Sequence, residues 1–226
     1  MIAGEYGAVV FDLDGTLADT AADIRDALVR AFAREGLPPI DVGSVRLMIG
    51  GGPQLLVERA LHRLGMPART NLVTRLASLF HDEARRSGNP QTRLFDGAAS
   101  MLRQLHAAGV PIGICSNKPH DLCHALVREL GIDAYIDEVL GSSDTMPKKP
   151  DPALLLGVIE RLGVPPGETL YIGDSETDVA TARAAGVPVM LVRHGYTARK
   201  ASQLGADAVI DSLADIVRPG RLARSA

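Results

Sequence analysis

Short runs of apolar residues alternate along this chain with longer stretches in which apolar residues recur every three or four positions. Several short runs are apolar without alternation, which is typical of strands buried on both faces of a parallel sheet. The longer stretches have helical spacing, and each is followed by a glycine, which favours the end of a helix. Strands are predicted at Ala8–Asp12, Val110–Cys115, Val139–Leu140, Leu170–Gly173, Val187–Val192 and Ala208–Ile210, and helices at 97–108, 119–130, 152–162 and 175–185. This alternation predicts an α/β fold with a parallel sheet.

The region from about Ala18 to Asn89 shows no strand pattern, only helical spacing. Apolar residues recur there at i, i+4 and i+8, in the sets Ile24, Leu28 and Phe32; Leu56, Ala60 and Leu64; and Leu72, Leu76 and Phe80. Segments rich in glycine and proline separate these sets. We therefore expect a helical domain at 18–89, inserted after the first strand, and a core domain made of 1–17 and 90–226.

Composition limits the possible partners. The 226 residues suit one core domain and a smaller accessory one, and the net charge of −3 indicates neither a nucleic-acid nor a membrane partner. No apolar run reaches the roughly 18 residues of a membrane helix, and the segment Met1–Tyr6 lacks the pattern of a secretory signal. Cys115 and Cys123 are too few for a disulfide framework, so we expect buried free thiols in a cytoplasmic protein. The sequence leaves the oligomeric state open.

The first predicted strand ends in the acidic segment Asp12-Leu13-Asp14-Gly15-Thr16. Residues two apart on an extended segment point the same way, so Asp12 and Asp14 can face one cavity. Gly15 permits a tight turn, and successive backbone N–H groups in such a turn can bind an anion. An acidic turn without a catalytic role is an equally good interpretation of this segment alone.

Two later segments carry groups suited to phosphate. Ser116 and Asn117 close the second core strand just before a helix, where they fit either phosphate binding or ordinary helix capping. Lys148 and Lys149 precede Pro150, which fixes the direction of the adjacent lysine. A lysine ammonium is a natural point charge for neutralising phosphate oxygens.

A third segment carries carboxylates suited to a metal. Asp174 ends a predicted strand, and Asp178 lies one turn into the following helix. Such oxygens suit Mg²⁺, which takes a few protein ligands and keeps several waters. Open parallel sheets bind ligands at the carboxyl ends of their strands, where all of these segments fall. Their combination therefore predicts a phosphate and metal site at that edge.

The order Asp-Leu-Asp-Gly-Thr, Ser-Asn, Lys-Pro and Gly-Asp-Ser-x-x-x-Asp resembles the haloacid dehalogenase superfamily. Within it, the chain is similar to the phosphoglycolate phosphatase branch over nearly its full length. The resemblance implies a Rossmann-like parallel sheet with helices on both faces. It also implies that the all-helical insertion at 18–89 is a cap domain.

The resemblance also implies a role for each motif residue. Asp12 would attack phosphorus, Asp14 would be the general acid and base, and Lys149 would offset the phosphoryl charge. The residues that would bind the phosphoryl group are Gly15, Thr16, Ser116, Asn117 and Lys149. Those that would hold Mg²⁺ are Asp12, Asp14 through its carbonyl, Asp174 and, in support, Asp178.

The implied reaction is Mg²⁺-dependent hydrolysis of a small phosphomonoester through an aspartyl-phosphate, with 2-phosphoglycolate as the first candidate. A β-phosphoglucomutase-like phosphosugar mutase would keep the same motifs, and a phosphatase or pyrophosphatase of another small metabolite is a further alternative. Arg46 and Arg59, in the helical insertion, could contact a substrate carboxylate, because arginine offers a bidentate fork. The segment Arg193–Thr197 could approach the active-site edge.

Overall fold

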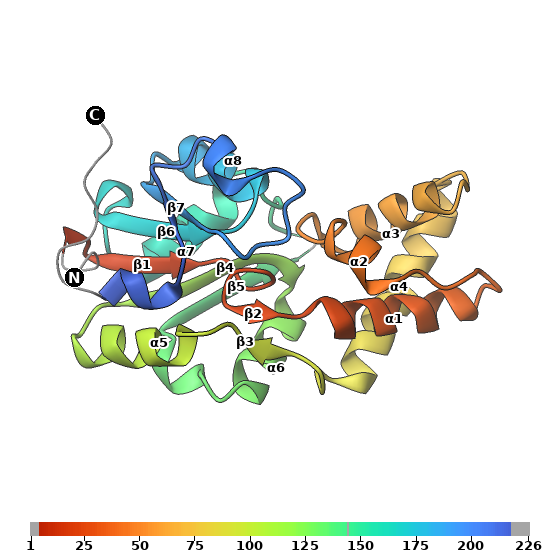
Figure 1. Ribbon diagram of the computed structural model, residues 1–226, viewed down its shortest axis with the longest axis horizontal. Coiled ribbons are helices and arrows are strands. Elements are labelled where there is room, and N and C mark those ends of the chain that lie inside the picture. Colours follow the sequence, from red (N-terminus) through yellow and green to blue (C-terminus); the bar gives the residue numbers. More distant parts are fainter. Residues whose placement is uncertain (1–4, 144, 218–226) are drawn as a thin grey trace.

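The computed structural model describes residues 5–143 and 145–217. Figure 1 shows a sheet flanked by helices and, at one end, a group of helices that stands apart from the sheet. The sheet has six strands in the order β5-β4-β1-β6-β7-β8, all paired in parallel. Their bounds are β1 Ala8–Phe11, β4 Ile112–Pro119, β5 Glu138–Ser142, β6 Thr169–Gly173, β7 Val189–Val192 and β8 Ala208–Ile210. The α/β fold with a parallel sheet is therefore confirmed, with shifts of a few residues at strand ends.

The central strand β1 lies between β4 and β6, and its register aligns the three carboxyl ends. Phe11 is opposite Ile114 on one side and Ile172 on the other. The residues that follow these strands therefore emerge close together. The strands β4 and β5 lie on one side of β1, and β6, β7 and β8 lie on the other. An open parallel sheet binds its ligands at the carboxyl ends of the strands where the order changes direction in this way.

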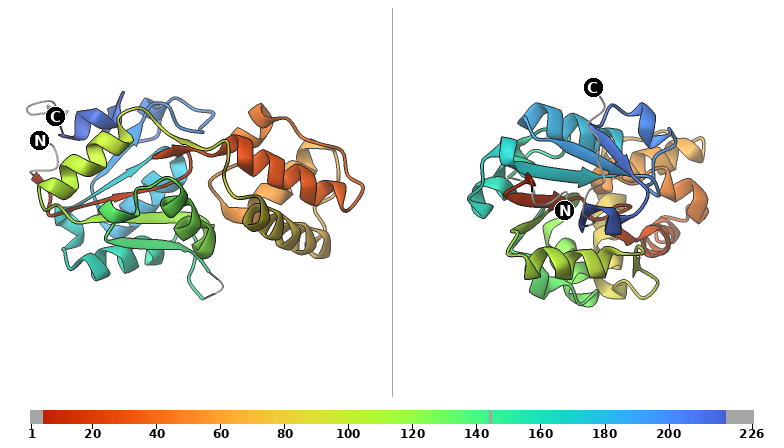
Figure 2. Two further views of the ribbon diagram at one scale, coloured as in Figure 1. Left: turned by 90° about the horizontal axis from the view of Figure 1, so that it is seen from below. Right: turned by 60° about the vertical axis from the view of Figure 1, so that its left-hand side comes forward.

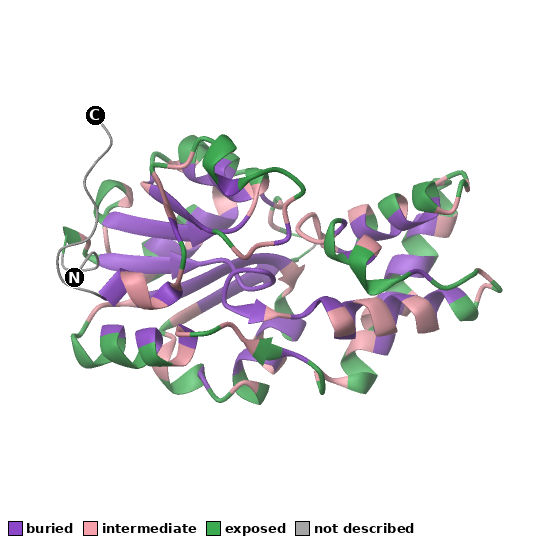
Figure 3. Ribbon diagram, viewed as in Figure 1, coloured by how far each residue is buried: buried purple, intermediate pink, exposed green. Residues whose placement is uncertain are grey.

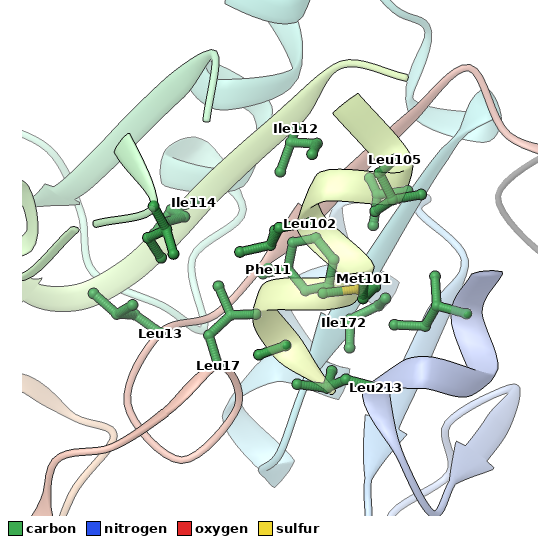
Figure 4. Close-up of a cluster of buried hydrophobic side chains, with 14 of the residues drawn as sticks. Phe11, Leu13, Leu17, Met101, Leu102, Leu105, Ile112, Ile114, Ile172 and Leu213 are labelled. Atoms are coloured by element: carbon green, nitrogen blue, oxygen red, sulfur yellow. The ribbon is translucent and has the colours of Figure 1, made fainter. Parts of the chain in front are cut away.

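Helices cover both faces of the sheet, as Figure 2 shows from two sides. Val9 and Phe11 point into one apolar cluster, with α5 (Ala98–Ala107), α6 (His120–Glu129) and the short 3₁₀ helix Leu213–Val217. Val10 points into the opposite cluster, with α7 (Ala153–Leu162) and α8 (Glu176–Ala185). Figure 4 shows the first cluster, in which Phe11 packs against side chains of α5. The strand runs lack polar alternation because both faces are buried (Figure 3).

The separate helical group follows β1 in the sequence and has its own apolar core. Its helices are α1 (Ala21–Ala33), α2 (Val42–Arg46), α3 (Gly52–Arg63) and α4 (Thr70–Ser87). The predicted periodic residues of α1, α3 and α4 meet inside this group, where Leu28, Ala60 and Leu76 are fully buried. The helical group therefore has a packed apolar core that is separate from the two clusters on the sheet.

A two-stranded antiparallel ribbon connects the helical group to the sheet. It consists of β2 (Ala18–Asp19) and β3 (Arg93–Leu94), with Ala18 opposite Leu94. The prediction that no strand occurs after Ala18 is therefore wrong at its first two residues. Two residues are too short to show an apolar alternation, so the sequence carried no signal for this ribbon. The division into domains at 18–89 stays a prediction.

Two further expectations concern the thiols and membrane helices. Cys115 and Cys123 are both free and buried, as predicted. Among residues 5–143 and 145–217, no helix combines the length and apolar character needed to cross a membrane.

Candidate active site

The acidic segment after β1 is held beside β6. The N–H of Asp12 donates to the Ile172 carbonyl at 2.8 Å, and the Asp12 and Asp14 side chains are both buried. Gly15 has a φ of 87°, and a Cβ there would lie 2.5 Å from a carboxylate oxygen of Asp174. No side chain fits in that space, so glycine is required both by conformation and by the approach of Asp174. The Thr16 hydroxyl also contacts Asp174, at 3.4 Å.

Lys149 lies between Asp12 and Asp178 of α8 and pairs with both. Its ammonium nitrogen is 2.9 Å from Asp12 Oδ1 and 2.8 Å from Asp178 Oδ1. It also donates to the Tyr171 hydroxyl at 2.9 Å and to the Cys115 carbonyl at 3.1 Å. Burial would lower the pKa of Lys149, but the carboxylates of Asp12 and Asp178 outweigh burial and raise it. Lys149 therefore supplies a permanent, fixed positive charge.

The neighbouring Lys148 points elsewhere. Its ammonium donates to the Gln54 side chain of α3 at 2.6 Å, on the exposed side of the segment. Of the two adjacent lysines, only Lys149 therefore contacts Asp12, as the position of Pro150 indicated.

Asn117 uses its side chain to hold the Lys149 segment in place. Its amide oxygen accepts from the Lys149 N–H at 2.8 Å, and its amide nitrogen donates to the Lys149 carbonyl at 2.9 Å. The same nitrogen donates to the Gly50 carbonyl of the helical group at 2.9 Å. The Ser116 hydroxyl, in contrast, has a single hydrogen-bond contact with residues 5–143 and 145–217, at 3.4 Å from the Lys118 N–H. Ser116 is thus the freer of the two groups predicted to bind phosphate.

Three buried carboxylates form an acidic cluster beside Lys149. One oxygen each from Asp12, Asp174 and Asp178 lies within 4.8 Å of the other two. Asp178 accepts from the Ser175 N–H at 3.0 Å and the Ser175 hydroxyl at 2.6 Å, besides its ion pair with Lys149. Asp174 accepts from the Tyr196 N–H at 2.6 Å. The cluster is therefore fixed in position by its surroundings.

The charges of this cluster are only partly balanced within the protein. Burial, opposed by Lys149 and reinforced by Asp178, raises the pKa of Asp12 to about 6. Burial and the two neighbouring carboxylates also raise the pKa of Asp174 well above its usual value. Burial would raise the pKa of Asp178 as well, but the Lys149 ammonium and hydrogen bonds from nearby side chains hold it below its usual value.

The chemistry of these ligand atoms fits a small divalent cation. Asp12 Oδ1 is buried, and no donor among the described residues makes an aligned hydrogen bond to it, although Lys149 lies within ion-pair distance. Hard carboxylate oxygens with uncompensated charge are the ligands that Mg²⁺ prefers. Asp12, Asp174 and Asp178 could therefore hold a metal ion.

Asp14 has a basic partner that the sequence did not indicate. The Lys118 ammonium lies 3.1 Å from Asp14 Oδ1 and 3.4 Å from Asp14 Oδ2, and only 8% of the Lys118 side chain is exposed. Lys118 follows Ser116 by two residues in β4, and both residues line the same pocket. That spacing was the one available signal.

A pocket opens above these residues, between the sheet edge and the helical group. Its lining from the sheet side comprises Asp12, Asp14, Ser116, Asn117, Lys118, Pro119 and Leu122. Most of its lining from the helical side is apolar and includes Ile24, Ile49, Leu56 and Phe80. Arg46 and Arg59 do not line it: Arg46 pairs with Asp19 at 2.7 Å, and Arg59 donates to the Met48 carbonyl at 2.9 Å. The expectation that these arginines meet a substrate is therefore not supported.

Residues 9–192 match the family model described as haloacid dehalogenase-like hydrolase. The chain belongs to the haloacid dehalogenase-like hydrolase family. It is 39% identical to the phosphoglycolate phosphatase of Rhodospirillum rubrum over 213 residues, which cover 92% of this chain and 88% of that protein. It is 37% identical to the phosphoglycolate phosphatase of Yersinia pestis over 210 residues, covering 92% of this chain and 90% of that protein. The resemblance to this superfamily and to its phosphoglycolate phosphatase branch is thus confirmed.

A solved structure of similar fold gives the same assignment. The crystal structure of a predicted phosphoglycolate phosphatase from Haemophilus somnus superposes with a TM-score of 0.86 at 26% identity. The match covers 94% of this chain and 97% of that one. The shared fold therefore includes the helical group as well as the sheet.

In this haloacid dehalogenase-like hydrolase, the predicted site residues gather at one edge of the sheet. Those in or beside the acidic cluster and the pocket are Asp12, Asp14, Gly15, Thr16, Ser116, Asn117, Lys149, Asp174 and Asp178. The segment Arg193–Thr197 also reaches this edge, because the N–H of Tyr196 binds Asp174. Sequence reasoning missed Lys118 and Tyr171, which have no motif of their own.

Proposed function

We propose that this protein is a Mg²⁺-dependent phosphatase that hydrolyses a small phosphomonoester, with 2-phosphoglycolate as the preferred candidate. The observation that carries the proposal is the Lys149 ammonium, held between Asp12 and Asp178, because Asp12 also lines the pocket. Relatives of similar length named phosphoglycolate phosphatase support the choice of substrate. The partner is thus a small metabolite rather than a nucleic acid or a membrane. The buried free thiols suit a cytoplasmic location.

The proposed reaction has two steps, both at Asp12. A carboxylate oxygen of Asp12 attacks phosphorus while the ester P–O bond breaks, and Asp14 gives its proton to the leaving oxygen. A water molecule then attacks the phosphorus of phosphorylated Asp12 while Asp14 accepts its proton. The bond between Asp12 and phosphorus breaks, and inorganic phosphate leaves. Two steps of this kind replace one difficult displacement by water.

Positive charge is needed because an anionic nucleophile must approach an anionic ester. Lys149 supplies one such charge beside Asp12. We assign Asp12, the Asp14 carbonyl and Asp174 as the groups that would hold Mg²⁺, with Asp178 in support. When bound, the metal offsets negative charge on the phosphoryl oxygens. We assign the Ser116 hydroxyl to binding the phosphoryl group, together with Gly15, Thr16 and Asn117.

We further propose that residues 18–89 act as a cap domain over a core made of 1–17 and 90–226. Its separate apolar core and its attachment through β2 and β3 support this division. The pocket draws its lining from both parts, so closure of the helical group would exclude water from the first step.

Phosphate release from a panel of esters tests the proposal. We expect release from 2-phosphoglycolate with a higher kcat/KM than from hexose phosphates, nucleotides or pyrophosphate, and we expect EDTA to abolish it until excess Mg²⁺ is added. A phosphosugar mutase would instead isomerise a sugar phosphate and release little phosphate. No Mg²⁺-dependent phosphate release from any member of the panel would contradict the proposed function.

A further inference from the structure

We infer that Lys118 recognises a carboxylate on the substrate, separated from the phosphate ester oxygen by one carbon. The inference rests on the proposed phosphatase function and specifies its substrate class, the short 2-phosphoryloxy carboxylic acids. Four features of the pocket support it: its charges, the engagement of the other basic side chains, the position of Lys118 against Asp14, and the apolar wall opposite.

Lys118 is the one basic side chain among the described residues that line the pocket. The same lining contains the carboxylates of Asp12, Asp14 and Asp23. A second anionic group on the substrate would be repelled here unless a cation stood beside it. Because Lys118 is nearly buried, its charge is weakly screened and acts strongly at short range.

The other nearby cations are engaged elsewhere. Lys149 is held by Asp12, Asp178 and two oxygen acceptors below the phosphoryl site. Lys148 donates to Gln54 outside the pocket lining. Arg46 and Arg59, the sequence-based candidates for a carboxylate, do not line the pocket and bind Asp19 and the Met48 carbonyl instead. The substrate's second charge is therefore left to Lys118.

The position of Lys118 limits how far this charge can lie from phosphorus. Asp14, as the proposed proton donor, stands against the ester oxygen, and the Lys118 ammonium contacts both oxygens of Asp14. A group that reaches Lys118 must therefore follow closely after the ester oxygen. A carboxylate on the adjacent carbon fits this spacing, whereas the second phosphate of a sugar bisphosphate lies several bonds further away.

The opposite wall of the pocket supports a short substrate. Ile24, Leu56 and Phe80 form an apolar surface on the helical side. Hydroxyl groups of a sugar that face these three side chains would lose their hydration without gaining a hydrogen-bonding partner from them. In a substrate with one carbon between the ester oxygen and the carboxylate, the carboxylate lies at Lys118 and little more than that carbon faces the apolar wall.

A matched pair of substrates tests the inference. The substrates are 2-phosphoglycolate and ethyl phosphate, which differ in having a carboxylate or a methyl group at the same distance from the ester. We expect wild type to prefer 2-phosphoglycolate, and we expect Lys118→Met to reduce this preference in kcat/KM by about 10- to 100-fold, the range for a hydrogen bond to a charged group. Lys118→Arg should keep part of the preference, and the exposed Lys200→Met should keep all of it.

Two results would overturn the inference. An equal loss for both substrates in Lys118→Met would mean that Lys118 serves only Asp14, and an unchanged preference would mean that another group recognises the carboxylate. If Lys118→Met has no measurable turnover, calorimetric binding of both esters to Asp12→Asn, with and without Lys118→Met, gives the same comparison. If wild type hydrolyses other members of the ester panel but neither of these two, the inference fails and the proposed phosphatase function stands; if it hydrolyses no member of the panel, the proposed function itself is contradicted.

Discussion

The backbone N–H of Tyr196 donates to a carboxylate oxygen of Asp174 at 2.6 Å, while the hydroxyl of the same tyrosine reaches the start of the helical group. That hydroxyl donates to Asp19 at 2.5 Å and accepts from the N–H groups of Thr20, at 2.7 Å, and Ala21, at 3.1 Å. One residue thus contacts both the acidic cluster and the junction between β2 and α1. Tyr196 fixes the direction in which the chain leaves the sheet.

Tyr196→Phe should destabilise the protein by about 1–3 kcal/mol, because the buried Thr20 N–H loses its acceptor and the Ala21 N–H keeps only a 3.5 Å contact with Asp19. Denaturant unfolding of the two proteins measures this difference. Tyr135→Phe is the matched control, since the Tyr135 ring packs on His106 away from the site. Equal stability of Tyr196→Phe and wild type would show that water replaces the hydroxyl at no cost.

Asp12→Asn should remove the nucleophile and leave the fold intact. We expect kcat to fall by about 10⁴-fold or more, with no acid-stable phosphorylated protein after quenching. The substitution also removes one charge from the acidic cluster, so the melting temperature of the metal-free protein should not decrease. Substantial turnover by this variant would mean that phosphorus is attacked by another group.

The acidic cluster should make the metal-free protein sensitive to pH. A carboxyl with a raised pKa holds its proton more tightly in the folded protein, so its contribution favours folding at low pH and is lost as pH rises. For Asp12 this loss runs from its ordinary pKa of 3.8 to about 6. Relative to Asp12→Asn, wild type without metal should therefore lose melting temperature across that interval.

Addition of Mg²⁺ should reverse that loss, because a cation compensates the same carboxylates. At pH 8 we expect Mg²⁺ to raise the melting temperature of wild type more than that of Asp12→Asn, and more than at pH 5. Thermal melts with Mg²⁺ or EDTA at both values measure this. Identical Mg²⁺ shifts in the two proteins would place the metal away from Asp12.

Asp23 should stabilise the segment at Gln91 and Thr92, through which the chain returns from the helical group to the sheet. Its carboxylate accepts from the Thr92 N–H and hydroxyl, both at 2.7 Å, and from the Gln91 N–H at 3.1 Å. Asp23→Ala should cost about 1–3 kcal/mol of stability by leaving buried donors without an acceptor. The half-buried neighbour Asp26, which among the described residues pairs with the side chains of Arg25 and Gln91, provides the control Asp26→Ala. Similar unfolding curves for the two variants would contradict this role of Asp23.

The sequence was informative wherever a signal was local. Each core strand was predicted because its apolar run is continuous, as Val9, Val10 and Phe11 show by filling opposite faces of the sheet. The helices of the inserted region were equally clear, since residues such as Leu76 and Phe80 recur at helical spacing and meet in one core. The positions of Asp12 and Asp174 beside each other followed from the rule for parallel sheet edges.

Relationships between distant residues could not be predicted in this way. The Lys118–Asp14 pair joins positions 104 residues apart, and no periodic pattern connects them. The ribbon between β2 and β3 is too short to have a pattern, and it depends on how the chain returns from the helical group. Asn117 was predicted as a phosphate ligand from its place after a strand, but only the fold shows its side chain bound to the Lys149 backbone.

The ribbon of β2 and β3 has a consequence for how this architecture can vary. Because Ala18 and Leu94 are paired, the outgoing and returning chain lie next to each other, and the intervening segment closes like a long hairpin loop. Residues between these positions can change in length or in fold while the register of the sheet stays the same. Replacing the helical group between these two positions is therefore a direct route to new substrate selectivity, because the residues at the sheet edge would not change.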